Sequence, residues 1–530
     1  MAIRKSGRKL HKIVVNSCVL TLSYGLFFSH KAAAFDWRMR PSLSMSEVFT
    51  DNLELSDTAK RSGFITEVAP GVSLFGTSPW SNFNLNYRLQ GLYNAGGSDA
   101  VDINHQLQMN GLYQAVRNRL FVQTSSSISQ QNISNGFIAT DNLTGGRDRT
   151  ETKNFSISPY WTPQFGQYAR GLVKVGYQNT SFDNASFGGG SVSSSGLISD
   201  SDTFSKQARL TSGTKFGRVR WSLNYSSQEQ SRATGDDVLF EQYQGDLRYY
   251  LNRKFNVFGQ AGYENNDYQT LNDSINNGFF YTFGGQWSPN RWYSLEAGYG
   301  NNRHVTVRFN PSPNFIGHVT YRNKEVGLNT GDSWDANIRY RAQQAFIGFN
   351  YSQDTTTVQQ VLVEQTAFDL TGPVIDTDID PVTGQPLSPL LNPNLPNFVD
   401  DVIVNKQASL TFGYQTGKSS YNLSFYNTRR TYELNPQEDN VYGASGSWNW
   451  RLAPRLNFYL RPTWQTIDNE ASSNDRYDVA LGFSKAIPIN LGRPLLMNTR
   501  LEFRHINQMS DLSTNDYVEN RATANFAVRF

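Results

Sequence analysis

The feature that most constrains this chain is a strict alternation of apolar and polar side chains. In residues 83–90 each odd position is apolar or aromatic and each even position is polar. Neighbouring side chains of a β-strand point to opposite faces, so this pattern predicts strands with one apolar face. The same alternation returns in four further segments, residues 218–225, 421–425, 456–461 and 497–504.

The composition indicates where that apolar face lies. Aromatic residues reach 13% and charged residues only 18%, with a mean hydropathy of −0.52. A disordered chain would be poor in aromatic residues, whereas a strand wall between lipid and water needs both aromatic and polar side chains. After residue 35 no apolar stretch is long enough for a spanning helix. A sheet in lipid must then close on itself, because unpaired backbone groups there cost several kcal/mol each.

The connections between the candidate strands alternate between short and long, as in outer-membrane barrels with short periplasmic turns and long external loops. We therefore expect residues 35–530 to form one antiparallel transmembrane β-barrel of about 22 strands, within a range of about 18 to 24. Strand patterning begins within about five residues of Phe35, which leaves no room for a plug domain before the barrel and argues against a TonB-type receptor. Short connections are residues 251–254, 288–291, 416–418 and 452–455, and long ones are residues 131–151, 183–201, 300–331 and 363–400.

Residues 1–34 have the three parts of a secretory signal peptide. A basic start precedes the apolar residues 13–28, and the alanines at 32–34 give a small-residue cleavage pattern that leaves Phe35 as the new N-terminus. The alternative is an uncleaved membrane anchor. The segment carries six of the 48 basic residues and no acidic ones, so the mature chain is slightly acidic and a nucleic-acid partner is not expected. Cys18, the one cysteine, also lies there, so no disulfide is expected.

Little in the sequence suggests catalysis, so we expect neither an enzyme nor a cofactor. The histidines after residue 34 are His105, His304, His318 and His505, which lack metal-ligand spacing. One loop has acidic oxygens at alternate positions, Asp376, Asp378 and Asp380, as calcium loops do. Pro381 and Leu387 replace the glycine and glutamate of such loops, which leaves a solvated acidic loop or a weak calcium site as alternatives.

Arginine is the prominent polar residue on the strand face that turns away from lipid. Two interpretations remain open: an arginine–carboxylate network that braces a wide interior, or a cationic lumen that favours anionic solutes. The candidate lumen residues are Arg88, Arg218, Arg220, Arg248, Arg339, Arg341, Arg461, Arg500 and Arg504.

The C-terminus ends in an alternating strand that places Phe526, Val528 and Phe530 on one face. A terminal aromatic strand of this kind resembles the signal read by the outer-membrane barrel assembly machinery. The alternative is an ordinary edge strand.

Five short segments carry a family resemblance: residues 41–52, 67–74, 86–91, 158–160 and 220–223. With them the chain resembles the outer-membrane proteins associated with the PEP-CTERM and exosortase system of Gram-negative bacteria, although Phe49 stands where tyrosine is expected. The resemblance implies a porin-like barrel in the cell outer membrane, linked to exopolysaccharide biosynthesis and export. An anionic polysaccharide and export-system components would be its partners. No catalytic residues are known for the family. The alternative function is a structural or adhesive barrel with a closed lumen.

Overall fold

The computed structural model describes residues 36–95, 101–132, 139–145, 149–183, 198–271, 275–366, 394–435, 437–470, 472–492 and 494–530. The predicted signal peptide, residues 1–34, lies outside these ranges, as does the calcium candidate Asp376, Asp378 and Asp380.

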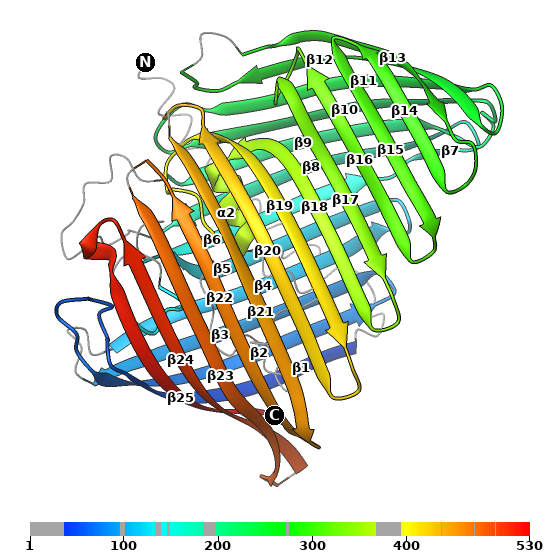
Figure 1. Ribbon diagram of the computed structural model, residues 1–530. Coiled ribbons are helices and arrows are strands. Elements are labelled where there is room, and N and C mark those ends of the chain that lie inside the picture. The colour runs from blue at the N-terminus through cyan, green and yellow to red at the C-terminus, as the bar shows by residue number, and fades with distance from the viewer. Residues whose placement is uncertain are drawn as a thin grey trace, which may run out of the picture.

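The described residues form one antiparallel sheet that closes into a barrel (Figure 1). Strand β1 (Asp36–Thr50) pairs with β2 (Gly63–Ser78) on one side and with β25 (Tyr517–Arg529) on the other. The first half of the wall continues with β3 (Ser81–Ala95), β4 (Val101–Val116), β5 (Leu120–Asn132), β6 (Arg149–Trp161), β7 (Gln164–Phe165), β8 (Ala169–Phe182), β9 (Ser201–Ser212), β10 (Val219–Arg232), β11 (Val238–Tyr250) and β12 (Phe255–Asp267).

The second half of the wall runs back to the seam beside β1. It consists of β13 (Gly278–Trp287), β14 (Tyr293–Gly300), β15 (Asn302–Ser312), β16 (Phe315–Lys324), β17 (Gly331–Arg341), β18 (Ala345–Thr357), β19 (Val402–Gln415), β20 (Ser419–Tyr432), β21 (Glu438–Ala453), β22 (Leu456–Asp468), β23 (Ser473–Asn490) and β24 (Pro494–Ser510).

The predicted all-β antiparallel barrel is confirmed, but the expected strand number is wrong. Of the 25 strands in the described residues, β7 is a two-residue extension that pairs only with β8, so 24 strands build the wall. The missing pair is β15 and β16, which occupy most of residues 300–331, the stretch interpreted from sequence as a long loop. Its polar residues and the turn at Pro313 and Asn314 hid two strands that pair through eight consecutive positions and a bulge.

Apolar side chains cover the outside of the wall. Leu223, Leu247, Phe283 and Leu501 are each more than half exposed there. Aromatic pairs ring the end with the short turns: Phe255–Trp287, Tyr421–Trp448 and Phe458–Phe483 have ring centroids 6.5, 6.0 and 5.4 Å apart. An apolar band with an aromatic girdle marks the lipid-facing surface of a transmembrane barrel.

Toward the other end, tyrosine hydroxyls on the same outer face donate hydrogen bonds to carboxylates. Tyr177 donates to Asp202 at 2.7 Å, Tyr321 to Asp332 at 2.6 Å, and Tyr243 to Glu241 at 3.0 Å. Each ring therefore lies in the apolar band while its hydroxyl reaches the polar collar above it. The collar marks the boundary at the end with the longer connections.

The lumen is not empty. One helix, α2 (Val358–Thr366), follows β18, and Val358, Val361 and Leu362 pack there against Tyr432 of the inner wall. Residues 139–145, between β5 and β6, also lie against the inner wall, with Leu143 packed on Val48, Ile65 and Leu92. The expectation of a barrel without a plug is therefore corrected, because parts of the long loops fill the interior. No described helix has the length and hydropathy needed to cross a membrane.

The seam between the first and last strands generates a prediction about assembly. The Phe530 amide donates a hydrogen bond to the Pro41 carbonyl at 2.8 Å, and the Phe526 and Met45 positions face each other across the seam. Deleting Phe530 removes both this bond and the terminal aromatic ring, so we expect less than about half of the protein to reach the folded form. Heat-modifiable migration on gels measures that fraction. Phe530→Tyr keeps the backbone and the ring and should assemble normally; full assembly of the deletion variant would refute the role of the residue.

Candidate functional site

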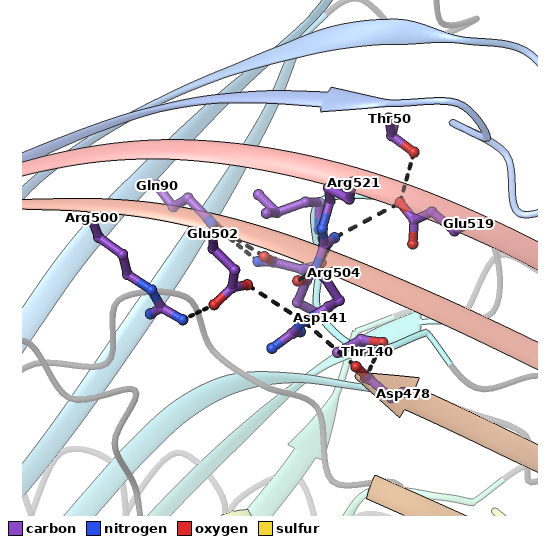
Figure 2. A network of polar contacts seen from close by, with 12 residues as sticks. Thr50, Gln90, Thr140, Asp141, Asp478, Arg500, Glu502, Arg504, Glu519 and Arg521 are labelled. Atoms are coloured by element: carbon purple, nitrogen blue, oxygen red, sulfur yellow. Dashed lines mark hydrogen bonds and ion pairs between the residues drawn. The ribbon is translucent and has the colours of Figure 1, made fainter. Parts of the chain in front are cut away.

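The centre of the interior is an ion pair between a loop and the last strand. Asp141 belongs to residues 139–145, here called the inward segment, and Arg521 belongs to β25. Two parallel hydrogen bonds join them, from Nη2 to Oδ2 at 2.6 Å and from Nη1 to Oδ1 at 3.1 Å, and the two side chains are only 3% and 2% exposed. This bidentate geometry is the strongest form of an arginine–carboxylate contact. Figure 2 shows the segment reaching the wall at this point.

Further ion pairs extend along the wall from this contact (Figure 2). Arg504 lies 3.7 Å from Asp478 and 3.5 Å from Glu502, and Arg500 pairs with the other oxygen of Glu502. The Tyr459 hydroxyl donates to Glu502 at 2.9 Å. On the strand next to Arg521, the Thr50 hydroxyl donates to Glu519 at 2.8 Å. Strands β22 to β25 and β1 are thus tied together on their inner face.

A second set of polar contacts involves the strands on the other side of the seam. Arg88 of β3 pairs with Glu67 of β2, and Gln90 donates to Glu67 at 2.8 Å and to Asn142 of the inward segment at 3.2 Å. Arg476 of β23 pairs with Asp478 at 3.2 Å and also donates to the Thr140 hydroxyl. The inward segment is therefore held from both sides.

Charges in this interior network are matched. Its arginines are Arg88, Arg476, Arg500, Arg504 and Arg521, and its carboxylates are Glu67, Asp141, Asp478, Glu502 and Glu519. The side chains of these residues are at most 11% exposed. Matched buried pairs add little net stability, but removing one partner of such a pair typically costs about 3–5 kcal/mol. In this half of the barrel, formed by β1–β6 and β19–β25, the arginines are braces.

A second part of the long loops spans the mouth of the barrel. Asp400 and Asp401 precede β19, and their backbone carbonyls accept hydrogen bonds from Arg232 of β10 at 3.3 and 3.4 Å. The Asp401 carboxylate accepts the amide hydrogens of Val402, Leu434 and Asn435. Burial raises the pKa of Asp401, and these amide donors act against the rise. Residues 394–401 and α2 thereby connect the β8–β10 side to the β19–β21 side.

The other half of the interior, lined by β8–β18, has a different charge pattern. Arg248 pairs with Glu296 at 2.9 Å, and among the described lysines and arginines on the inner face of this half it is the one with an ion pair; His304 and His318 lie 3.4 and 3.0 Å from Glu296 and Asp335. Cross-strand partners share a face, so the register places the remaining basic groups on the inner wall. The lysines and arginines are Arg170, Lys174, Arg209, Arg220, Arg232, Arg248, Arg308, Arg322, Lys324, Arg339 and Arg341, against Asp246, Glu264, Glu296, Asp335 and Asp354.

The predicted lumen arginines therefore fall into two groups. Arg88, Arg500 and Arg504 join the matched network, and Arg461 lies over the Tyr459 ring at 4.4 Å on the same side. Arg220, Arg248, Arg339 and Arg341 lie in the cationic half, and Arg218 lies in the turn before β10. The predicted assembly strand, with Phe526, Val528 and Phe530, ends at the seam.

Sequence reasoning placed Glu502 on the same strand face as the arginines but missed the other carboxylate partners of the braces. The alternation identifies the phase of Arg476 and Arg521 within their strands, and the same phase was available for Glu67 and Asp478. Asp141 has no such signal, because it lies in a polar loop 380 residues before Arg521 in the sequence.

No protein-family model and no curated protein match the sequence. Among solved structures, the siderophore receptor PirA from Pseudomonas aeruginosa is 10% identical with a TM-score of 0.40, over 93% of this chain and 80% of that chain. OpdK from Pseudomonas aeruginosa, solved with vanillate, is 6% identical with a TM-score of 0.32, over 93% and 99%. OmpT from Vibrio cholerae is 11% identical with a TM-score of 0.29, over 94% and 100%.

The location follows from the wall itself. A closed antiparallel barrel with an apolar exterior and an aromatic girdle is the form in which β-strands cross an outer membrane. The chain is a large outer-membrane β-barrel with a polar interior. Cleavage after residue 34 stays a prediction.

The buried ion pair predicts how the inward segment is held. Arg521→Gln leaves the Asp141 carboxylate buried without its cation. Removing one partner of a buried ion pair costs about 3–5 kcal/mol, so we expect this substitution to release the segment from the wall. A cysteine at Ala139, in a Cys18→Ala background, reports this release, and we expect thiol labelling at least about tenfold faster in the Arg521→Gln variant. Arg429→Gln breaks an exposed pair with Glu438 and should leave the labelling rate unchanged. Equal rates in both variants would show that the pair does not hold the segment.

Acid should release the same segment. Burial acts to raise the pKa of Asp141, but the Arg521 guanidinium outweighs it and holds this pKa below its ordinary value of 3.8. A carboxylate with a lowered pKa stabilises the folded state at any pH above its ordinary value, and this contribution is lost as the pH falls through the lowered value. Labelling of the Ala139→Cys variant by a pyridyl disulfide, which reacts in acid, should be constant from pH 7 to pH 5 and rise only below about pH 3.8. A rise between pH 7 and pH 5 would contradict this.

Proposed function

We propose that this chain is a porin-like barrel that passes anionic polysaccharide across the outer membrane, as a component of exopolysaccharide biosynthesis and export in a PEP-CTERM/exosortase system. One observation carries the transport part of the proposal. In the β8–β18 half of the lumen, basic side chains exceed carboxylates, and Arg339 and Arg341 at the short-turn end are exposed. Support for the exopolysaccharide part comes from the sequence resemblance described above.

The charge pattern favours anions for an electrostatic reason. Charges along a low-dielectric wall are screened less than charges in bulk water, so an excess of guanidinium groups attracts anions and repels cations. The matched pairs of the other half contribute no such field at a distance. We propose that solutes follow the cationic half, while the matched half stays filled by the inward segment.

A structural or adhesive barrel with a closed lumen is the second candidate. The observation that favours it is the connection from α2 and residues 394–401 to Arg232, which spans the mouth. This candidate predicts no ionic current through the purified protein.

Insertion would proceed through the barrel assembly machinery, which we propose reads Phe526, Val528 and Phe530 at the seam. Neither candidate function includes catalysis, a cofactor or nucleic acid.

Planar-bilayer recordings separate the two candidates. We expect measurable conductance and a reversal potential in a salt gradient that indicates anion preference, weakening as the ionic strength rises. Replacing Arg339 and Arg341 together by glutamine should reduce the anion-to-cation permeability ratio about twofold or more without unfolding, because lumen substitutions tune selectivity.

A matched control removes two charges from the same end of the barrel. Arg117→Gln with Arg119→Gln changes the exposed turn between β4 and β5 and should leave selectivity unchanged. Cation preference, or an unchanged ratio in the Arg339 and Arg341 variant, would refute the cationic path, and absence of current would favour the closed barrel.

A further inference from the structure

The cationic half of the interior contains a cavity of about 500 Å³. Strands β8 to β12 line one side of it, and β16, β18 and the connection at residues 325–330 line the other. This volume is within the usual range for a small-molecule site. The cavity extends from Lys174, in the short-turn half of β8, to Lys324 at the opposite end of β16.

Amides and hydroxyls dominate the lining. Gln207, Gln228, Gln242 and Asn266 contribute amides, and Ser205 and Ser226 contribute hydroxyls. An amide side chain offers both donors and acceptors, so this lining matches a ligand with many hydroxyl groups. Phe240 supplies an aromatic ring among these polar groups.

The two lysines distinguish the site from a neutral one. Lys174 has no hydrogen-bond or ion-pair partner among the described residues. Lys324 interacts electrostatically with Glu264, whose carboxylate also accepts hydrogen bonds from Gln242 at 3.0 Å and from the Leu328 amide at 3.1 Å.

One further carboxylate, that of Asp354, lines the cavity, whereas the carboxylate of Glu241 lies on the outer face of the wall. Asp354 interacts electrostatically with Glu364 of α2, while Glu241 accepts bonds from the outer-face tyrosines Tyr225 and Tyr243. Asp354 therefore lies at the α2 end of the cavity and leaves the end with Lys174 cationic.

We propose that this cavity is a binding site for a short stretch of carboxylate-bearing sugar units, with Lys174 and Lys324 each holding a carboxylate at its own end of the cavity and the amides between them holding the hydroxyls. The inference rests on the proposed function, since it gives the polymer a place to bind on the cationic path. A ligand that enters from the short-turn end passes Arg170 and Arg209, on the inner faces of β8 and β9, before it meets Lys174.

Direct binding to purified full-length protein in detergent tests the site without any need for an open pore. Calorimetry with a tri-uronate and with a neutral trisaccharide of equal length should show at least about tenfold tighter binding of the acidic sugar. Glutarate, an anion without hydroxyls, should bind at least about tenfold more weakly than the tri-uronate.

Substitutions of the charged residues test whether binding depends on their charge, with folding checked independently. Lys174→Gln with Lys324→Gln should reduce tri-uronate affinity to that of the neutral sugar, while Lys174→Arg should keep it and Asp354→Asn should strengthen it a few-fold. Heat-modifiable migration verifies that each variant is folded. Equal affinity for the acidic and neutral sugars, or unchanged affinity in the double variant, would overturn the proposal.

The outcomes are distinguishable from those of the conductance experiment. Acidic-sugar binding that depends on the lysines, in a protein without conductance, would refute the transport role and keep the site. Anion-selective conductance without any sugar binding would refute the site and keep the pore.

Discussion

The structure depends on one constraint, which is that no backbone N–H or C=O group can remain unpaired in the hydrocarbon of a bilayer. Pairing β1 with β25 satisfies it, and the Phe530 amide completes the seam at the Pro41 carbonyl. In the closed barrel, each strand has one face toward lipid and one face toward the polar interior. The outer positions carry leucine and aromatic rings, and the inner positions carry arginine, glutamine and carboxylates.

The charge of the interior arginines is stabilised in two ways. Where loops cover the wall, arginines such as Arg521 and Arg504 are buried, and each lies beside carboxylates. Where the wall stays open, Arg339 and Arg341 are exposed and need no partner, since water solvates them. The difference between brace and open cation is thus set by the carboxylates on the neighbouring strands together with the inward segment that covers them.

The sequence predicts the wall well and the interior poorly. Period-two alternation identifies strands such as β3, β10 and β24 because one face of each lies in lipid. It fails for β15 and β16, which contain polar residues and were interpreted as a loop, and it does not find α2, whose apolar positions follow a helical period over a short stretch. The partner of Arg521 could not be predicted, because the contact between Asp141 and this residue depends on the path of a loop and has no periodicity. The alternation predicted that these arginines lie on the inner face of their strands. It did not predict which of them form ion pairs.

The contact between Asp141 and Arg521 also imposes an order in time. The two residues are 380 positions apart, and Arg521 belongs to the last strand of the wall. Before that strand arrives, the Asp141 carboxylate lacks its bidentate partner, and burying it without that partner would be costly. Docking of the inward segment is therefore a late step in the folding of the barrel. The ion pair that braces the finished wall can therefore form only in a molecule whose wall is complete.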